Sequence, residues 1–74
     1  MENKVKSILA SILNLSVDSI DNTTSQESIE QWDSWKHMNL VVALEEEFNI
    51  EFEDDDIDKL LSFSAIIDVL KEKI

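Results

Sequence analysis

The chain contains no cysteine, glycine, proline or tyrosine among its 74 residues, and all six of its basic residues are lysines. Without cysteine it has no disulfide framework, no thiolate metal cluster and no thiol nucleophile, which agrees with a reducing cytoplasm. Without glycine and proline it lacks residues on which tight hairpin turns rely, so helices are favoured. A continuous apolar run and a signal-peptide pattern are also missing from the N-terminal region. We therefore expect a cytoplasmic chain that does not insert into membranes.

Positive charge is scarce, because six lysines stand against 17 acidic residues and give a net charge of −11. Such a field repels phosphodiester backbones and anionic membrane surfaces, which argues against nucleic-acid binding. Nine of the 17 acids fall between residues 45 and 58. This concentration either steers a basic partner or is a solvated face. A chain of this length forms one small domain, residues 1–74, without room for a deep substrate cavity, and we expect a monomer.

Apolar periodicity predicts an all-α fold. Apolar residues spaced at i, i+3 and i+4 indicate helices over residues 2–15, 34–48, 54–60 and 64–73. The period is lost over residues 16–33, where Ser, Thr, Asn and Asp crowd a long first loop. Apolar side chains should tie this loop to the core, because an unanchored connection of this length is unusual in a compact domain. The expected anchors are Val17, Ile20, Ile29 and Trp32.

The second predicted helix is the best defined, because Ser34, a favourable N-cap residue, precedes a run of strong helix formers. At about 100° per residue, one stripe of this helix should face the core. Trp35 and Val42 lie on the opposite side beside polar residues. An exposed apolar patch of this kind is typical of an interaction surface. The inward stripe consists of His37, Leu40, Val41, Leu44 and Phe48.

Serines stand at two predicted helix starts. Ser64 is the expected cap of the last helix. Ser34 lies where a loop meets the longest helix, so unpaired N–H groups and the positive end of the helix dipole converge there. A phosphate esterified to the Ser34 hydroxyl would be well accommodated at this point. The alternative interpretation is that Ser34 is only a cap, worth about 1 kcal/mol of helix stability.

The neighbours of Ser34 decide between these interpretations. Residues 33–48 read DSWKHMNLVVALEEEF and resemble the acyl carrier protein family, in which Asp-Ser-Leu opens the second helix and a Leu-Val-x-Ala-Leu-Glu-Glu-Glu-Phe run follows. The match is close over residues 33–52 and loose over the whole chain. The resemblance implies a four-helix bundle with a long first loop and a short third helix.

The resemblance also implies a function. Ser34 would bear a covalent 4′-phosphopantetheine arm, transferred from coenzyme A by a phosphopantetheinyl transferase in a magnesium-dependent reaction, with Asp33 and Trp35 beside it. Acyl groups would be held as thioesters on the thiol of the arm and delivered to partner enzymes with basic docking surfaces, so the chain would be a carrier and not an enzyme. The residues expected to meet these partners are Trp35, Lys36, Met38, Asn39, Val42, Glu45, Glu46, Glu47, Asp54, Asp55 and Asp56.

The chain departs from the family pattern at several positions. Residues 31–32, Gln and Trp, and Ser16 stand where glycine is frequent, and Trp35 replaces the usual Leu or Met. Lys36 and Asn39 occupy positions where fatty-acid carriers commonly show acidic residues. The start of the second helix is therefore less negative than in such carriers. We expect a specialised carrier with a dedicated set of enzymes.

A catalytic alternative involves His37, which lies three residues beyond Ser34 and could form a hydrolase-like constellation with it and Asp33. A nucleophilic serine also needs an oxyanion site and an enclosed substrate pocket. Neither has a signal in this sequence. We expect His37 to head the inward stripe and to meet a loop carbonyl or a carboxylate.

Three binding alternatives remain. The alternating acids of residues 54–58 are similar to a calcium loop, but Lys59 and Ala65 stand where an EF-hand requires Gly and Glu. An acidic helical adaptor could dock a partner through Trp35 and Val42 without any cofactor. An aminoacyl or peptidyl carrier would use the same serine, because the sequence does not encode the cargo. The absence of a Gly-rich segment before the serine favours acyl cargo.

Overall fold

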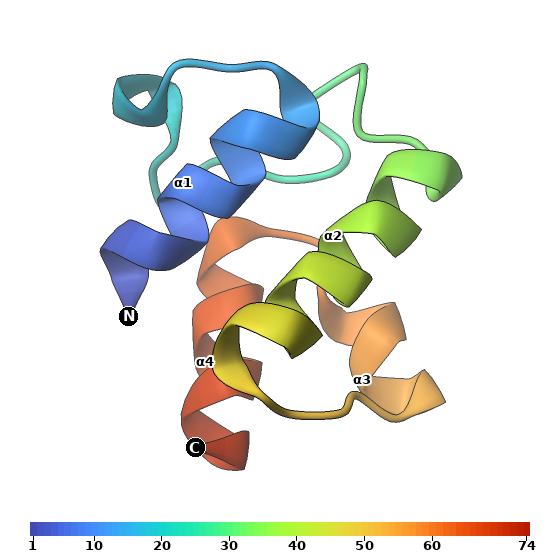
Figure 1. The fold of residues 1–74 in the computed structure, drawn as a ribbon. Helices are drawn as coiled ribbons and strands as arrows, with labels where there is room; N and C mark the ends of the chain where they lie inside the picture. Colours follow the sequence, from blue (N-terminus) through green and yellow to red (C-terminus); the bar gives the residue numbers. More distant parts are fainter.

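A computed structural model describes all residues 1–74 and contains four α-helices joined by loops (Figure 1). A short 3-10 turn lies in the long first loop, and an isolated bridge between Ser25 and Ser62 is the only β-type pairing. The predicted all-α fold, with its long first loop and short third helix, is confirmed. The elements are α1 (Glu2–Leu13), η1 (Val17–Ser19), α2 (Ser34–Phe48), α3 (Asp54–Lys59) and α4 (Phe63–Lys73).

Two asparagines end helices in a chain that has no glycine. Asn14 follows α1 with φ 57°, and Asn49 follows α2 with φ 54°; both backbones are left-handed. Each residue donates its N–H to a carbonyl of the last helical turn, Ala10 or Glu45 respectively. Asparagine tolerates this conformation better than most residues, so it takes the place that glycine usually has at a helix end. The helix predicted over residues 2–15 therefore ends two residues early.

The last helix also begins earlier than the sequence indicates. Its N-cap is Ser62, whose hydroxyl accepts a hydrogen bond from the Ala65 backbone N–H at 3.0 Å. The prediction of Ser64 as the cap is wrong, because Ser64 lies inside α4. With the cap at Ser62, the large side chain of Phe63 is 1% exposed and becomes part of the core.

The core is one cluster of 16 buried apolar residues drawn from α1, α2, α4 and the loops. No residue within α3 is fully buried, so this short helix lies on the surface of the bundle. The predicted inward stripe of α2 is buried except for Phe48, which is partly buried. None of the helices has the length and apolarity needed to cross a membrane.

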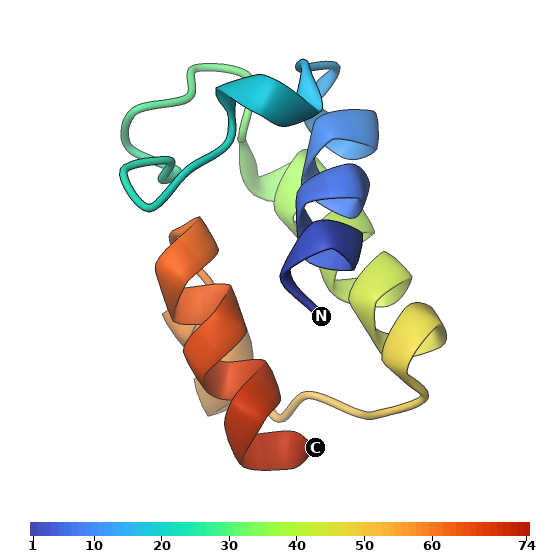
Figure 2. The ribbon, with the colours of Figure 1, turned by 90° about the vertical axis from the view of Figure 1, so that its left-hand side faces the viewer.

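The long first loop is fixed where it approaches the start of α4 (Figure 2). The Gln26 N–H donates to the Leu61 carbonyl at 2.8 Å, and the Phe63 N–H donates to the Thr24 carbonyl at 3.0 Å. Gln31 adds a side-chain hydrogen bond of 3.2 Å to the Leu13 carbonyl. Backbone pairing at this junction limits the freedom of the segment that leads into α2.

Apolar anchors fix the same loop from inside. Ile20 and Trp32 are each 2% exposed, and Ile29 packs against the core from a partly buried position. Val17 does not act as an anchor, because it opens the 3-10 turn and is 43% exposed. Three of the four predicted anchors therefore tie the loop down.

Candidate functional site

Ser34 is the first residue of α2 and is exposed to solvent. The N-cap is Asp33, whose carboxylate Oδ1 accepts a hydrogen bond from the Lys36 N–H at 2.9 Å. The prediction that Ser34 caps the helix is therefore wrong by one residue. A carboxylate at this position satisfies a free N–H and also lies at the positive end of the helix dipole. The cap thus leaves the Ser34 hydroxyl free for other chemistry.

His37 lies beneath Ser34, 9% exposed, and both of its ring nitrogens are engaged. The Trp32 indole Nε1–H donates to Nδ1 at 3.0 Å, and Nε2 lies 3.0 Å from the Ile57 carbonyl oxygen. The planes of the two rings are inclined by 26° and their centroids are 6.1 Å apart, so the rings meet edge to edge through this hydrogen bond. Because an indole N–H only donates, Nδ1 must accept, and the ring proton is assigned to Nε2. His37 meets a carbonyl as predicted, but that carbonyl belongs to α3, and neither nitrogen is free to act as a base for Ser34.

A shallow hollow of about 320 Å³ lies beside Ser34, between α2, α3 and the long loop. Both apolar and polar side chains line it, so it offers van der Waals contact and hydrogen-bonding groups. The sequence did not indicate Gln26 or Leu61 as part of this site. Gln26 lies in the long loop and Leu61 at the α3–α4 junction, and only the fold brings these segments next to Ser34. The Ser34 hollow is lined by Gln26, Ser34, His37, Met38, Ile57, Asp58 and Leu61.

The outer side of α2 exposes large apolar side chains next to the serine. Trp35 is 75% exposed, Met38 50% and Val42 48%, in agreement with the helical periodicity. Asn39 and Glu46 are exposed on the same side. These five residues form what we call the α2 outer face.

The acidic residues expected to meet partners divide into two groups. Some have roles inside the fold: Glu45 Oε2 accepts from the Phe52 N–H at 2.8 Å, and Glu47 lies 3.8 Å from the Lys4 ammonium. Asp56 makes the most contacts of this kind, because one of its carboxylate oxygens accepts both from the Lys73 ammonium at 2.8 Å and from the Glu53 N–H at 3.0 Å. The acids without an ion pair or a side-chain hydrogen bond inside the protein are Glu46, Asp54 and Asp55.

The Asp56–Lys73 contact shifts the titration of both groups. The hydrogen bond from the Lys73 ammonium, with a smaller effect of the Glu53 N–H, lowers the pKa of the Asp56 carboxyl below its usual value. The same hydrogen bond raises the pKa of Lys73. This pair connects the start of α3 to the end of α4.

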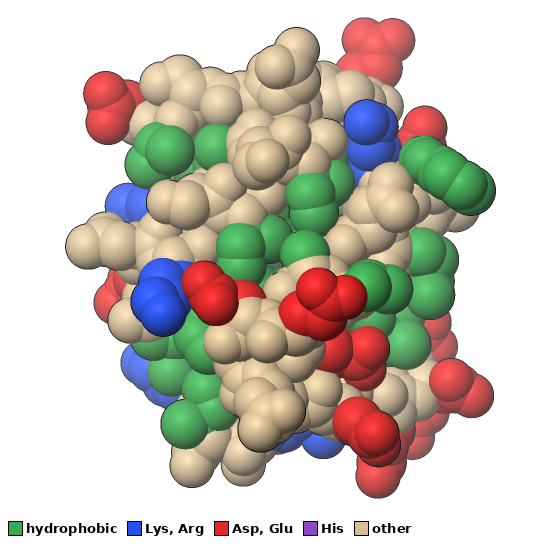
Figure 3. Space-filling model, viewed as in Figure 1, with side chains coloured by type: hydrophobic (Ala, Val, Ile, Leu, Met, Phe, Trp, Pro, Cys, Tyr) green, Lys and Arg blue, Asp and Glu red, His purple; other side chains and the backbone are tan.

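Negative charge gathers over α3, at the lower right of Figure 3, while near the start of α2 a basic side chain lies among acidic and apolar ones. Lys36, in the first turn of α2, has no carboxylate within ion-pair distance. Asp33 is exposed beside Lys36, so the charges at the start of α2 are mixed, whereas the last turn of α2 has Glu45 to Glu47 and no basic residue. No group of three or more His, Asp or Glu side chains is arranged to hold a metal ion.

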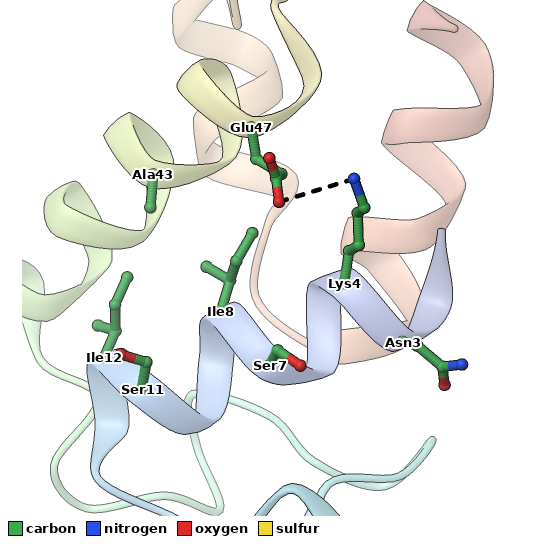
Figure 4. Close-up of a pocket in the computed structure, with 8 residues that line it drawn as sticks. All are labelled: Asn3, Lys4, Ser7, Ile8, Ser11, Ile12, Ala43 and Glu47. Carbon is green, nitrogen blue, oxygen red and sulfur yellow. Dashed lines mark ion pairs between the residues drawn. The ribbon is translucent and has the colours of Figure 1, made fainter.

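The largest hollow lies elsewhere, between α1 and α2, with a volume of about 460 Å³ (Figure 4). Ile8 and Ile12 from α1 approach Ala43 from α2 along its floor, and the Lys4–Glu47 ion pair spans one end. Asn3, Ser7 and Ser11 complete its lining. Ser34 and its neighbours take no part in this hollow, so it is separate from the candidate site.

The chain is similar to known carrier proteins over nearly all of its length. A family model described as the phosphopantetheine attachment site matches residues 3–70. The acyl carrier protein of Buchnera aphidicola subsp. Schizaphis graminum is 38% identical over 99% of this chain and 92% of its own length. This chain belongs to the acyl carrier protein family. A second acyl carrier protein, from Buchnera aphidicola subsp. Baizongia pistaciae, is 35% identical over all of this chain and 95% of its own length.

The fold agrees with that of the family. The solution structure of a holo acyl carrier protein from Nitrosomonas europaea superposes with a TM-score of 0.83, at 24% identity, over 96% of this chain and 92% of its own. Family membership confirms the resemblance predicted from residues 33–48 and identifies the cofactor as covalently attached 4′-phosphopantetheine. It also assigns a carrier role rather than a catalytic one, which replaces the cofactor-free adaptor and the hydrolase-like interpretation.

Proposed function

We propose that Ser34 is the attachment site of the 4′-phosphopantetheine arm and that the protein carries acyl groups as thioesters on it. The observation that supports this most directly is the position of the Ser34 hydroxyl, exposed at the first residue of α2 while Asp33 provides the cap. Free N–H groups of the first helical turn favour an anionic phosphodiester at this position. When bound, the arm supplies the thiol that the cysteine-free chain lacks.

The residues around Ser34 have distinct tasks in this proposal. Asp33 holds the start of α2 in place through its hydrogen bond to the Lys36 N–H. The fixed loop before it presents the serine to a phosphopantetheinyl transferase, which attaches the arm from coenzyme A. The exposed Trp35 indole contacts the arm or the enzymes that approach it. The chain binds and presents, and the enzymes supply the catalysis.

The α2 outer face is the proposed contact surface for acyl-loading and acyl-transferring enzymes. Trp35 and Val42 provide the apolar contact, since large exposed apolar groups beside charged ones are typical of interfaces. Glu46, with Asp54 and Asp55 of α3, attracts basic groups of the partner. At the start of α2, Lys36 favours contact with a carboxylate of the partner.

This charge order supports a specialised pathway with its own enzymes. A partner whose docking surface is uniformly basic is repelled by the unpaired Lys36. Exchanging Lys36→Asp together with Asn39→Glu should therefore raise the kcat/KM of fatty-acid enzymes that use this carrier. Lys71→Asp, which reverses the charge of a lysine in α4, should leave it unchanged. Equal turnover by all three proteins would contradict the specialised role.

Attachment at Ser34 is tested by intact mass spectrometry. The protein is incubated with coenzyme A, magnesium and a broad-range phosphopantetheinyl transferase, and we expect its mass to rise by one phosphopantetheine. Ser34→Ala should show no increase, while Ser28→Ala, which changes a serine of the loop that leads into α2, should be modified normally. No increase in the wild type, or an increase that survives Ser34→Ala, would refute the assignment.

A further inference from the structure

His37 is the one buried titratable side chain, and the proposed carrier function does not use it. Its imidazole joins three parts of the fold: Trp32 in the segment before Ser34, α2 on which it lies, and Ile57 in α3. Both hydrogen bonds measure 3.0 Å. A buried imidazole with hydrogen bonds at both nitrogens is held in one orientation, because rotating the ring would break both bonds.

The bond to Trp32 determines what the other nitrogen does. Since the indole N–H occupies Nδ1 as an acceptor, Nε2 bears the proton and donates to the Ile57 carbonyl. That carbonyl also accepts from the Leu60 N–H at 3.2 Å, at the C-terminal end of α3. The histidine therefore contacts the internal hydrogen bonding of the short helix.

The helix α3 depends on such contacts more than the others do. It spans six residues, none of them fully buried, and its apolar packing is limited to the partly buried Ile57. Its start is tied to α4 by Asp56 and Lys73, and its middle to α2 by His37. Ser34, His37 and Ile57 all line the Ser34 hollow, so the position of α3 determines the shape of that hollow.

We propose that His37 is a positioning residue for the modification of Ser34, because its donation to the Ile57 carbonyl fixes α3 against α2 and so maintains one shape of the surface that the transferase meets. The bond from Trp32 sets the tautomer that makes this donation possible. This inference rests on the proposed attachment at Ser34, but its structural part is tested on the unmodified protein.

The tautomer is tested first, by the nitrogen chemical shifts of the His37 ring in the unmodified protein. We expect a neutral ring with the proton on Nε2. The Trp32 indole N–H should exchange slowly with solvent, and the indole N–H of the 75% exposed Trp35 gives an internal reference for fast exchange. A proton on Nδ1, or equal exchange of the two indoles, would overturn the proposal.

Two amide substitutions of His37 each keep one of its two hydrogen bonds and remove the other. In His37→Asn the side-chain oxygen replaces Nδ1 and keeps the bond from Trp32, but its amide is too short to reach Ile57. In His37→Gln the amide nitrogen replaces Nε2 and donates to Ile57 without help from Trp32. The exchange of the Leu60 amide should be roughly three- to tenfold faster in His37→Asn, the factor that one net hydrogen bond contributes to local opening, and near wild type in His37→Gln.

Transferase kinetics then test positioning. We expect His37→Asn to raise the KM for the unmodified carrier with kcat unchanged, because the correct arrangement is less populated while Ser34 itself is intact. The rise should be smaller than the change in Leu60 exchange, since KM varies inversely with the populated fraction of the correct arrangement. His37→Gln should retain the wild-type KM, although it leaves the buried Trp32 N–H without a partner and is the less stable of the two. His37→Asn should therefore be the more stable variant but the poorer substrate, and His37→Gln the less stable variant but the better substrate.

Each outcome is decisive. If KM follows the midpoints of chemical unfolding, so that His37→Gln is the poorer substrate, His37 is only structural and the proposal fails. Equal KM values for all three proteins also refute it. If the wild-type protein is not modified at Ser34, the proposed function fails, and the exchange measurements still report separately whether His37 holds α3.

Discussion

The helices α2 and α4 differ in how their charges are arranged. In α4 the cap is Ser62, and Lys71 and Lys73 lie in the last turn, at the negative end of the helix dipole. In α2 the last turn has no basic residue; it has Glu45 to Glu47, and Lys36 lies in the first turn. Two of the three charged residues in the last turn of α4 favour its dipole, with Glu72 the exception, whereas the charges within α2 oppose its dipole.

The apolar residues show the same difference. Five residues of α4 are buried, and its outer side is polar, whereas α2 exposes Trp35, Met38 and Val42. Burial of these large side chains would stabilise the fold, so their exposure is explained better by contact with another molecule. The comparison indicates that α4 is arranged for stability and α2 for recognition.

Side-chain truncation should give the largest contrast between the two helices. Leu70→Ala in α4 removes a fully buried side chain and should lower the free energy of unfolding by about 2–5 kcal/mol. Val42→Ala in α2 removes a side chain that is 48% exposed and should change stability by less than about 0.5 kcal/mol. Chemical denaturation measures both. Similar losses for the two variants would remove the distinction between the helices.

The N-caps should give an intermediate effect. Asp33→Ala and Ser62→Ala each remove an acceptor for a backbone N–H and should cost about 1 kcal/mol. Ser34→Ala should change the free energy of unfolding by less than about 0.5 kcal/mol, because Ser34 does not cap α2. Thermal or urea unfolding of the three variants checks this order. A larger loss at Ser34 than at Asp33 would assign the cap to the serine after all.

The sequence predicted most of the fold, because the helices depend on local patterns. Apolar periodicity placed all four helices and the inward stripe of α2, and residues 33–48 indicated the family. The errors lie at helix ends, where neighbouring residues compete for one task. Asp33 and Ser34 are both good caps, and so are Ser62 and Ser64; which of them caps depends on the packing of residues such as Phe63.

Contacts between distant segments could not be predicted in the same way. The Ser34 hollow requires Gln26 and Leu61, which the long loop and the α3–α4 junction bring to α2. The same holds for the Asp56–Lys73 pair and for the Ile57 carbonyl that His37 meets. Periodicity assigns His37 to the inner side of α2, but no local pattern identifies its two partners.

Charge reversal should show a smaller effect on stability, with opposite sign in the two helices. Glu46→Lys places a cation in the last turn of α2 and should raise the free energy of unfolding by about 0.3–1 kcal/mol. Lys71→Glu in α4 should lower it by a similar amount, about 0.3–1 kcal/mol. Measurements at low salt detect both, and added salt should reduce the two effects together. Destabilisation by Glu46→Lys would contradict the idea that the acidic residues at the end of α2 lower the stability of the helix.

The smallest effect concerns pH and the Asp56–Lys73 pair that joins α3 to α4. Because the folded-state pKa of Asp56 is lowered, its contribution is fully present above the unfolded value of about 3.9 and is lost as the pH falls through the folded value. The pKa of Lys73 is raised, so its contribution is present below the unfolded value of about 10.4 and is lost as the pH rises through the folded one. The difference in unfolding midpoint between wild type and Asp56→Asn should thus be greatest near neutral pH and vanish in strong acid. Asp55→Asn, next to it in α3 and without a lysine partner, should show no such dependence, and a constant difference for Asp56→Asn would exclude ionisation as the cause.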